Sequence, residues 1–131
     1  MTERQFVRSG VRWEAEVGYS RAVRTGIHVA VSGSTATQSD GTIAGVGDEY
    51  TQARFALDVI VRALAEVGAS PRHVVRTRMF VTNIANWEAV GRAHGEVFGD
   101  VRPATSMVQV AALIHADMLV EIEADAIIDD L

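Results

Sequence analysis

The sequence predicts an α+β fold in which two helices cover one face of a mixed β-sheet. Two segments carry apolar residues at every third or fourth position, whereas the segments around them alternate apolar and polar residues or are rich in β-branched residues. Their order is β-β-β-α-β-α-β-β, and two amphipathic helices can cover only one face of a sheet. The 131 residues contain no repeat, linker or low-complexity stretch, so we expect one domain over residues 1–131.

Three strands are predicted before the first helix. An edge strand is expected around Phe6 and Val7, and strands are expected at residues 19–24 and 27–33, joined by a turn. Residues 34–47 are rich in Ser, Thr, Gly and Asp and are interpreted as an ordinary long loop.

The first helix has the clearest pattern in the sequence. Its apolar face consists of residues spaced three and four apart: Tyr50, Ala53, Leu57, Ile60, Leu64 and Val67. Asp48 is the expected N-cap, and Gly68 is typical of the position after a last turn. Ser70-Pro71 is predicted to begin a single further turn. Beyond it we expect a strand at 74–81, a helix at 86–98, and strands at 106–113 and 118–128.

The composition excludes several kinds of chemistry. The chain has no cysteine and no lysine, which removes disulfides, thiolate nucleophiles, Schiff bases and the lysine of a phosphate-binding loop. A net charge of −5 without any basic run argues against nucleic acid as a partner. No apolar run could cross a membrane and no signal peptide is recognisable, so a cytoplasmic location is expected.

Three carboxylates alternate along the last predicted strand. Glu121, Glu123 and Asp125 would lie on one face, about 6.6 Å apart from one to the next. Such a set could act as a general acid or base or bind a metal. For Glu123 and Asp125 we favour the alternative, which is pairing with arginines such as Arg76 and Arg78.

The histidines do not suggest a metal site. No two of them have a spacing typical of metal ligands, so neither a zinc nor an iron site is expected. His94 is interpreted as a surface or interface residue of the second helix, and His115 as a turn residue.

Two C-terminal motifs carry a family resemblance. Residues 102–110, Arg-Pro-Ala-Thr-Ser-Met-Val-Gln-Val, and residues 120–126, Val-Glu-Ile-Glu-Ala-Asp-Ala, resemble the signature of the Rid (YjgF-like, reactive intermediate deaminase) family. The likeness extends to nearly the whole chain. It implies a chorismate-mutase-like fold and a homotrimer, in which three sheets form a central barrel and small-molecule sites lie between subunits. It also implies hydrolysis of reactive enamines and imines without a cofactor.

The resemblance assigns roles to residues. Glu121 matches the glutamate that orients the attacking water, and Tyr19, Ser32 and Gly33 match residues that hold the substrate or line the cleft. Met107 stands where the family often has cysteine.

Thr105 departs from the family pattern, because active deaminases have an arginine there that binds the substrate carboxylate. The chain therefore resembles branches that lack this arginine. Arg21, on the same strand face as Tyr19, or Arg24 could replace it, although salt bridging at a surface or interface is the favoured interpretation of both. Thr105→Arg is predicted to raise any deamination of 2-iminopropionate.

Three functions are open at this point. The leading hypothesis is a homotrimer whose inter-subunit cleft binds, and could hydrolyse, a small imine, enamine or related carbonyl compound. In it Glu121 would position water, and Tyr19, Thr105 and the backbone of Ser32 and Gly33 would hold the substrate. The alternative is a non-catalytic, ligand-binding or regulatory trimer. A ribonuclease or translation inhibitor, an older label of the family, is disfavoured by the acidic composition.

Overall fold

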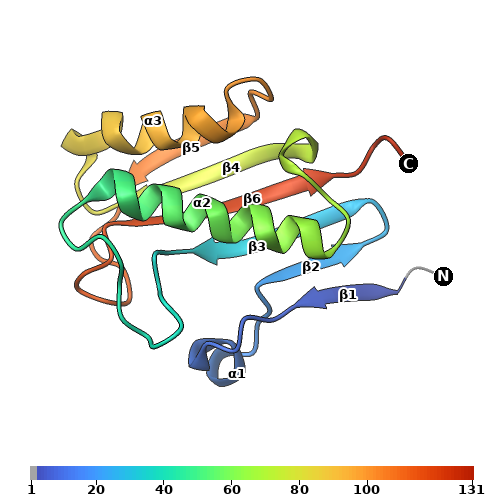
Figure 1. The fold of residues 1–131 in the computed structure, drawn as a ribbon, viewed down its shortest axis with the longest axis horizontal. Coiled ribbons are helices and arrows are strands. Elements are labelled where there is room, and N and C mark those ends of the chain that lie inside the picture. Colours follow the sequence, from blue (N-terminus) through green and yellow to red (C-terminus); the bar gives the residue numbers. More distant parts are fainter. Residues whose placement is uncertain (1–2) are drawn as a thin grey trace.

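A computed structural model describes residues 3–131 as a six-stranded mixed sheet with two helices packed on one face (Figure 1). The strand order is β1-β2-β3-β6-β4-β5, and every neighbouring pair is antiparallel except β4 and β5. The strands are β1 (Arg4–Val7), β2 (Ala22–Thr25), β3 (His28–Ser34), β4 (Val74–Val81), β5 (Ala104–Gln109) and β6 (Val120–Ile127). The predicted α+β class and the order of its main elements are confirmed.

Helix α2 (Glu49–Glu66) forms as its sequence pattern predicts. The Asp48 carboxylate accepts a hydrogen bond from the Thr51 amide at 3.0 Å, which caps the first turn. At the other end Gly68 has a φ of +83°, a conformation that glycine adopts with little strain. The predicted single turn follows as a 3₁₀ helix at Pro71–His73.

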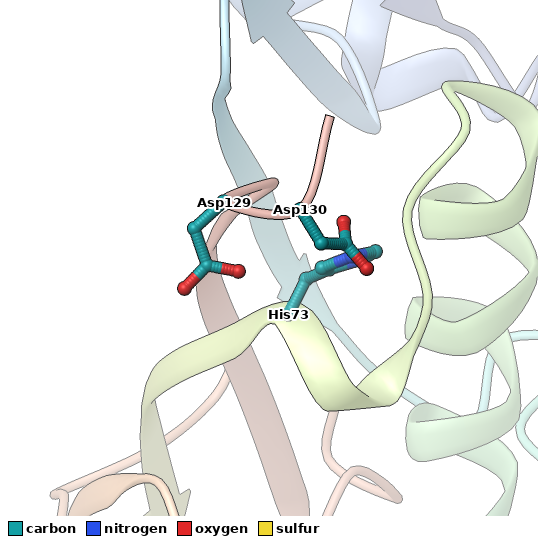
Figure 2. Close-up of side chains that lie close together, drawn as sticks. All are labelled: His73, Asp129 and Asp130. Atoms are coloured by element: carbon teal, nitrogen blue, oxygen red, sulfur yellow. The ribbon is translucent and has the colours of Figure 1, made fainter.

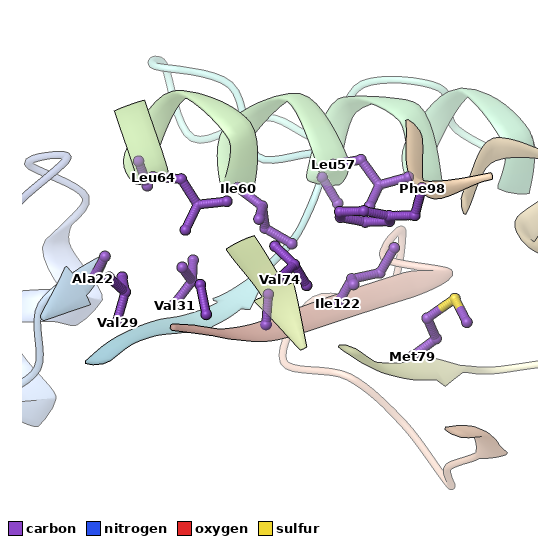
Figure 3. Packing of buried hydrophobic residues seen from close by; sticks show 14 of the residues in the cluster. Ala22, Val29, Val31, Leu57, Ile60, Leu64, Val74, Met79, Phe98 and Ile122 are labelled. Carbon is purple, nitrogen blue, oxygen red and sulfur yellow. The ribbon is translucent and has the colours of Figure 1, made fainter. Parts of the chain in front are cut away.

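The core lies between α2 and the centre of the sheet (Figure 3). Leu57, Ile60 and Leu64 of α2 are fully buried, and Ile122 of β6 lies among the residues beneath them. Helix α3 (Trp87–Phe98) adds Phe98 to this cluster beside α2. Burying each large apolar side chain contributes about 1.5–3 kcal/mol, so this layer fixes the position of β3 and β6.

Parts of the fold differ from the sequence prediction. Helix α1 (Arg12–Val17) was not expected, and it ends at Gly18 in a left-handed conformation. A 3₁₀ turn at Ile84–Asn86 precedes α3. The predicted strand at 106–113 is wrong at both ends, because β5 covers Ala104–Gln109. The predicted strand at 74–81 agrees with β4 at both ends. Strands β2 and β3 begin later than predicted and end one residue later, and β6 is shorter than predicted at both ends.

The sheet face away from the helices carries the predicted charges. Arg78 pairs with Glu123 and with Asp125, each at 3.2 Å, which confirms the structural interpretation of these two carboxylates. Arg76 forms no ion pair within residues 3–131, so pairing inside one chain is confirmed for Arg78 and not for Arg76. No helix in the same range combines the length and the apolar character needed to span a bilayer.

Candidate functional site

The site begins at an irregularity in the pairing of β3 with β6. The register shifts between Val31 and Ser34, so Gly33 lies directly against the side chain of Glu121. A Cβ added to Gly33 would lie 2.8 Å from Glu121 Cδ and closer still to Oε2. Only glycine therefore leaves room for the carboxylate in this position.

Arg21 lies beside this pair, just before β2. Its Nη2 donates a hydrogen bond to the Gly33 carbonyl oxygen at 2.5 Å, and its Cζ lies 5.7 Å from the centre of the Tyr19 ring. Arg24, the other candidate anchor, is directed elsewhere. It donates to the carbonyl oxygens of Gly26 at 2.8 Å and Val67 at 2.5 Å, where it caps the C-terminal end of α2.

These residues form one wall of an open pocket of about 780 Å³. The polar wall consists of Tyr19, Arg21, Ser32, Gly33 and Glu121. The lining also includes an apolar group, called the apolar wall below, which consists of Trp13, Val17, Phe55, Val59, Ile114 and Met118. A pocket with a few convergent polar groups and an apolar remainder is typical of small-molecule sites.

The apolar wall was not predicted from the sequence. Phe55 and Val59 lie four residues apart on α2, beside the apolar stripe that packs into the core. This second apolar pair on the helix surface is the feature of the sequence that could have indicated the wall. Trp13 comes from α1 and packs with Phe55 and Met118 in a small cluster separate from the main core.

The pocket alters the proton affinity of its acidic groups. Burial raises the pKa of Glu121, and the nearby positive charge of Arg21 partly opposes this rise. Burial also raises the pKa of Tyr19, again opposed by Arg21. The Ser32 hydroxyl donates to the Ser20 carbonyl oxygen at 2.6 Å, so its proton is already bound and the oxygen is left as an acceptor.

Within a single subunit, Thr105 and Met107 do not line this pocket. Both are on β5, at the opposite edge of the sheet from β1 and β2. Thr105 Oγ1 donates to the Thr77 carbonyl oxygen at 3.2 Å and accepts from Thr77 Oγ1 at 2.7 Å. Thr77 is fully buried and also lies 2.8 Å from His94 Nε2. Burial lowers the pKa of His94, so the half-buried imidazole is neutral at pH 7.

A second group of titratable residues lies at the C-terminal end of the chain (Figure 2). Ligand atoms of His73, Asp129 and Asp130 come within 4.8 Å of one another, an arrangement that residue spacing did not reveal. Both ring nitrogens of His73 are occupied, however. Nδ1 accepts from the Ser70 amide at 3.0 Å, and Nε2 therefore carries the proton that bonds Asp130 at 2.8 Å. We interpret this group as a clamp on the C-terminal residues.

Comparison with known proteins identifies a family over almost the whole chain. The family described as Endoribonuclease L-PSP matches residues 10–128. An uncharacterized protein of Streptomyces coelicolor is 41% identical over 120 residues, which cover 92% of this chain and 89% of that protein. The 3-aminoacrylate deaminase RutC of Acinetobacter baylyi is 32% identical over 108 residues, 82% of this chain and 85% of RutC.

Solved structures show the same fold. Rv2704 of Mycobacterium tuberculosis, described as a member of the YjgF/YER057c/UK114 family, is 48% identical with a TM-score of 0.87. The match covers 95% of this chain and 99% of Rv2704. YyfA of Yersinia pestis, described as a member of the conserved Rid family, is 30% identical with a TM-score of 0.83 over 95% of this chain and 99% of YyfA.

Proposed function

Because the chain belongs to the YjgF/Rid family, whose domain is also described as endoribonuclease L-PSP, we propose that it hydrolyses a small imine or enamine. The observation that carries the proposal is the position of Glu121, which lies against Gly33 in a pocket that Arg21 and Tyr19 also line. The relative named 3-aminoacrylate deaminase supports this class of reaction.

In the proposed reaction the Glu121 carboxylate is the general base. It accepts a proton from water as the water oxygen bonds to the imine carbon, and it returns the proton to the imine nitrogen. The resulting amino alcohol then loses ammonia as the carbonyl forms, so one imine and one water give one carbonyl compound and one ammonia. An enamine first takes a proton on carbon and gives up a proton from nitrogen, which converts it to the imine. Burial favours this role, because a raised pKa makes the carboxylate a stronger proton acceptor.

A homotrimer would complete the site in this proposal. Strand β5 is an exposed edge strand, and Val108 on it is 47% exposed. Exposed edges with apolar side chains are typically covered by a partner. A second copy that places its β5 over the open side of the pocket would bring Thr105 and Met107 close to Glu121.

The proposal is tested by following ammonia and pyruvate release from 2-iminopropionate, generated in the assay by oxidation of alanine. We expect Glu121→Gln to lower the enzyme-dependent rate by about a hundredfold, since general bases contribute about 10²–10⁴-fold. Glu123→Gln is the matched control. Glu123 lies on the same face of β6 as Glu121, but its carboxylate pairs with Arg78. Equal rates for wild type and Glu121→Gln, with both folded, would refute the mechanism.

The second candidate is a trimer that binds the same ligands without turnover. The commitment of the Thr105 hydroxyl proton to Thr77 favours it, because Thr105 then offers no donor to a substrate. Thermal stabilisation by a 2-oxo acid without release of ammonia from any imine would support this candidate over the deaminase. RNA cleavage is not proposed, because the net charge of −5 opposes binding to a polyanion.

A further inference from the structure

The guanidinium of Arg21 has hydrogen-bonding capacity that the fold does not use. An arginine carries five N–H donors, and the structure shows one of them, on Nη2, bonded to Gly33. The Nε of Arg21 is buried and has no hydrogen-bond partner among residues 3–131. A buried donor without a partner is destabilising, so its presence in a residue that lines the pocket indicates a ligand-binding role.

The charge of Arg21 is also not neutralised by an ion pair. Within residues 3–131, no carboxylate oxygen lies within 4.0 Å of its nitrogens. Glu121 is close enough for Arg21 to affect its pKa but does not form a salt bridge with it. Arg78, on the same sheet, differs because it pairs with two carboxylates.

The pocket as a whole favours a negatively charged ligand. Arg8, Arg21 and Arg62 line it, against two carboxylates, those of Glu66 and Glu121. Its apolar wall would accept a hydrocarbon body on the same ligand. Together these features match a small carboxylic acid with an apolar side chain.

We propose that Arg21 anchors the carboxylate of the ligand, in place of the arginine that position 105 lacks, and so selects 2-imino and 2-oxo carboxylates with apolar side chains. A carboxylate would take the free donors of the planar guanidinium while Nη2 keeps its bond to Gly33. Arg24 cannot serve, because it bonds the backbone at the end of α2. This inference rests on the proposed function, because it assumes that the substrate binds in the pocket of Glu121. It concerns binding of the ligand and not its hydrolysis.

Calorimetric titration tests the inference with 4-methyl-2-oxopentanoate and its uncharged amide, which differ only in the carboxylate. We expect wild type to bind the acid at least about tenfold more tightly than the amide, as for a charge-assisted hydrogen bond. Arg21→Gln should lose this preference. Arg24→Gln, the matched control, should keep it.

The outcomes separate the two proposals. If Arg21→Gln keeps the preference, or if wild type binds the amide as well as the acid or binds neither, the assignment of Arg21 is overturned. If Arg21→Gln does not fold, wild type is compared with Arg21→Lys. Lysine keeps the positive charge but lacks the planar, forked donors, so Arg21→Lys should prefer the acid over the amide less strongly than wild type does. Each result leaves the Glu121→Gln hydrolysis test intact, because the titration requires no turnover.

Discussion

Gly33 and Glu121 are in contact where the register between β3 and β6 shifts, between Val31 and Ser34. The shift turns the end of β3 so that its backbone, and not a side chain, faces the carboxylate. Arg21 donates a hydrogen bond to the carbonyl oxygen of the same glycine, so the backbone of Gly33 contacts both Arg21 and Glu121.

The first prediction concerns Gly33→Ala. The backbone of Gly33 lies outside the left-handed region, so alanine is tolerated conformationally and the methyl group acts only by displacing Glu121. A displacement of about 1 Å can lower a rate by about a hundredfold, so we expect kcat/KM for imine hydrolysis to fall by about tenfold to a hundredfold.

Two controls accompany this prediction. Gly95→Ala on α3 should leave the rate unchanged, because nothing lies within 4 Å of the added Cβ. In thermal melts, Gly33→Ala should destabilise the wild type but not Glu121→Ala, in which the obstructing carboxylate is missing. Equal destabilisation in both backgrounds would show that the contact does not cause the effect.

The pH dependence of hydrolysis should report the pKa of Glu121. Burial raises this pKa above the ordinary 4.5, and Glu121 must be deprotonated to accept a proton. The acid limb of the kcat/KM profile should therefore lie above pH 4.5. The negative charge of Glu123 raises the pKa of Glu121, so Glu123→Gln should move the acid limb to lower pH. The positive charge of Arg21 lowers this pKa, so Arg21→Gln should move the limb to higher pH. An acid limb that neither substitution moves would contradict the assignment.

Position 105 offers a third prediction. If a neighbouring copy places Thr105 over the pocket, Thr105→Arg should raise kcat/KM for 2-iminopropionate by about tenfold, because arginine adds a charged, forked donor. Thr105→Val should change the rate little, since the hydroxyl proton is already bound by Thr77. A wild type that already works as fast as the RutC deaminase, combined with a slower Thr105→Arg, would contradict our interpretation of Thr105.

Much of the fold could be predicted because its signals are local. Helix α2 has an apolar stripe, a capping aspartate and a terminal glycine, all readable from neighbouring residues. Helix α1 has only six residues, too few for a helix to be stable on its own, and its formation depends on packing of Trp13 against distant residues. The predicted strand at 106–113 was too long because the apolar residues at 110–113 continue the pattern after β5 has ended.

The site was predictable only where a motif marks it. Tyr19, Ser32 and Glu121 were assigned from the family resemblance, and the structure brings them to one pocket. The contact of Glu121 with Gly33 depends on a register shift, and the pairing of His73 with Asp130 joins residues 57 positions apart. Both result from tertiary packing, which has no counterpart in residue spacing.

The last prediction concerns the C-terminal clamp. The hydrogen bond from His73, and then that from Arg72, lowers the pKa of Asp130 below its ordinary 3.8. Because the folded pKa is the lower one, the stabilisation by Asp130 is present above the unfolded value and is lost as the pH falls through the folded value. The melting temperature of wild type should therefore exceed that of Asp130→Asn at pH 6, and the difference should shrink below about pH 4. Asp129→Asn is the control, because His73 bonds Asp130 and not Asp129. A difference that persists unchanged to pH 3, or an equal difference for Asp129→Asn, would refute the clamp.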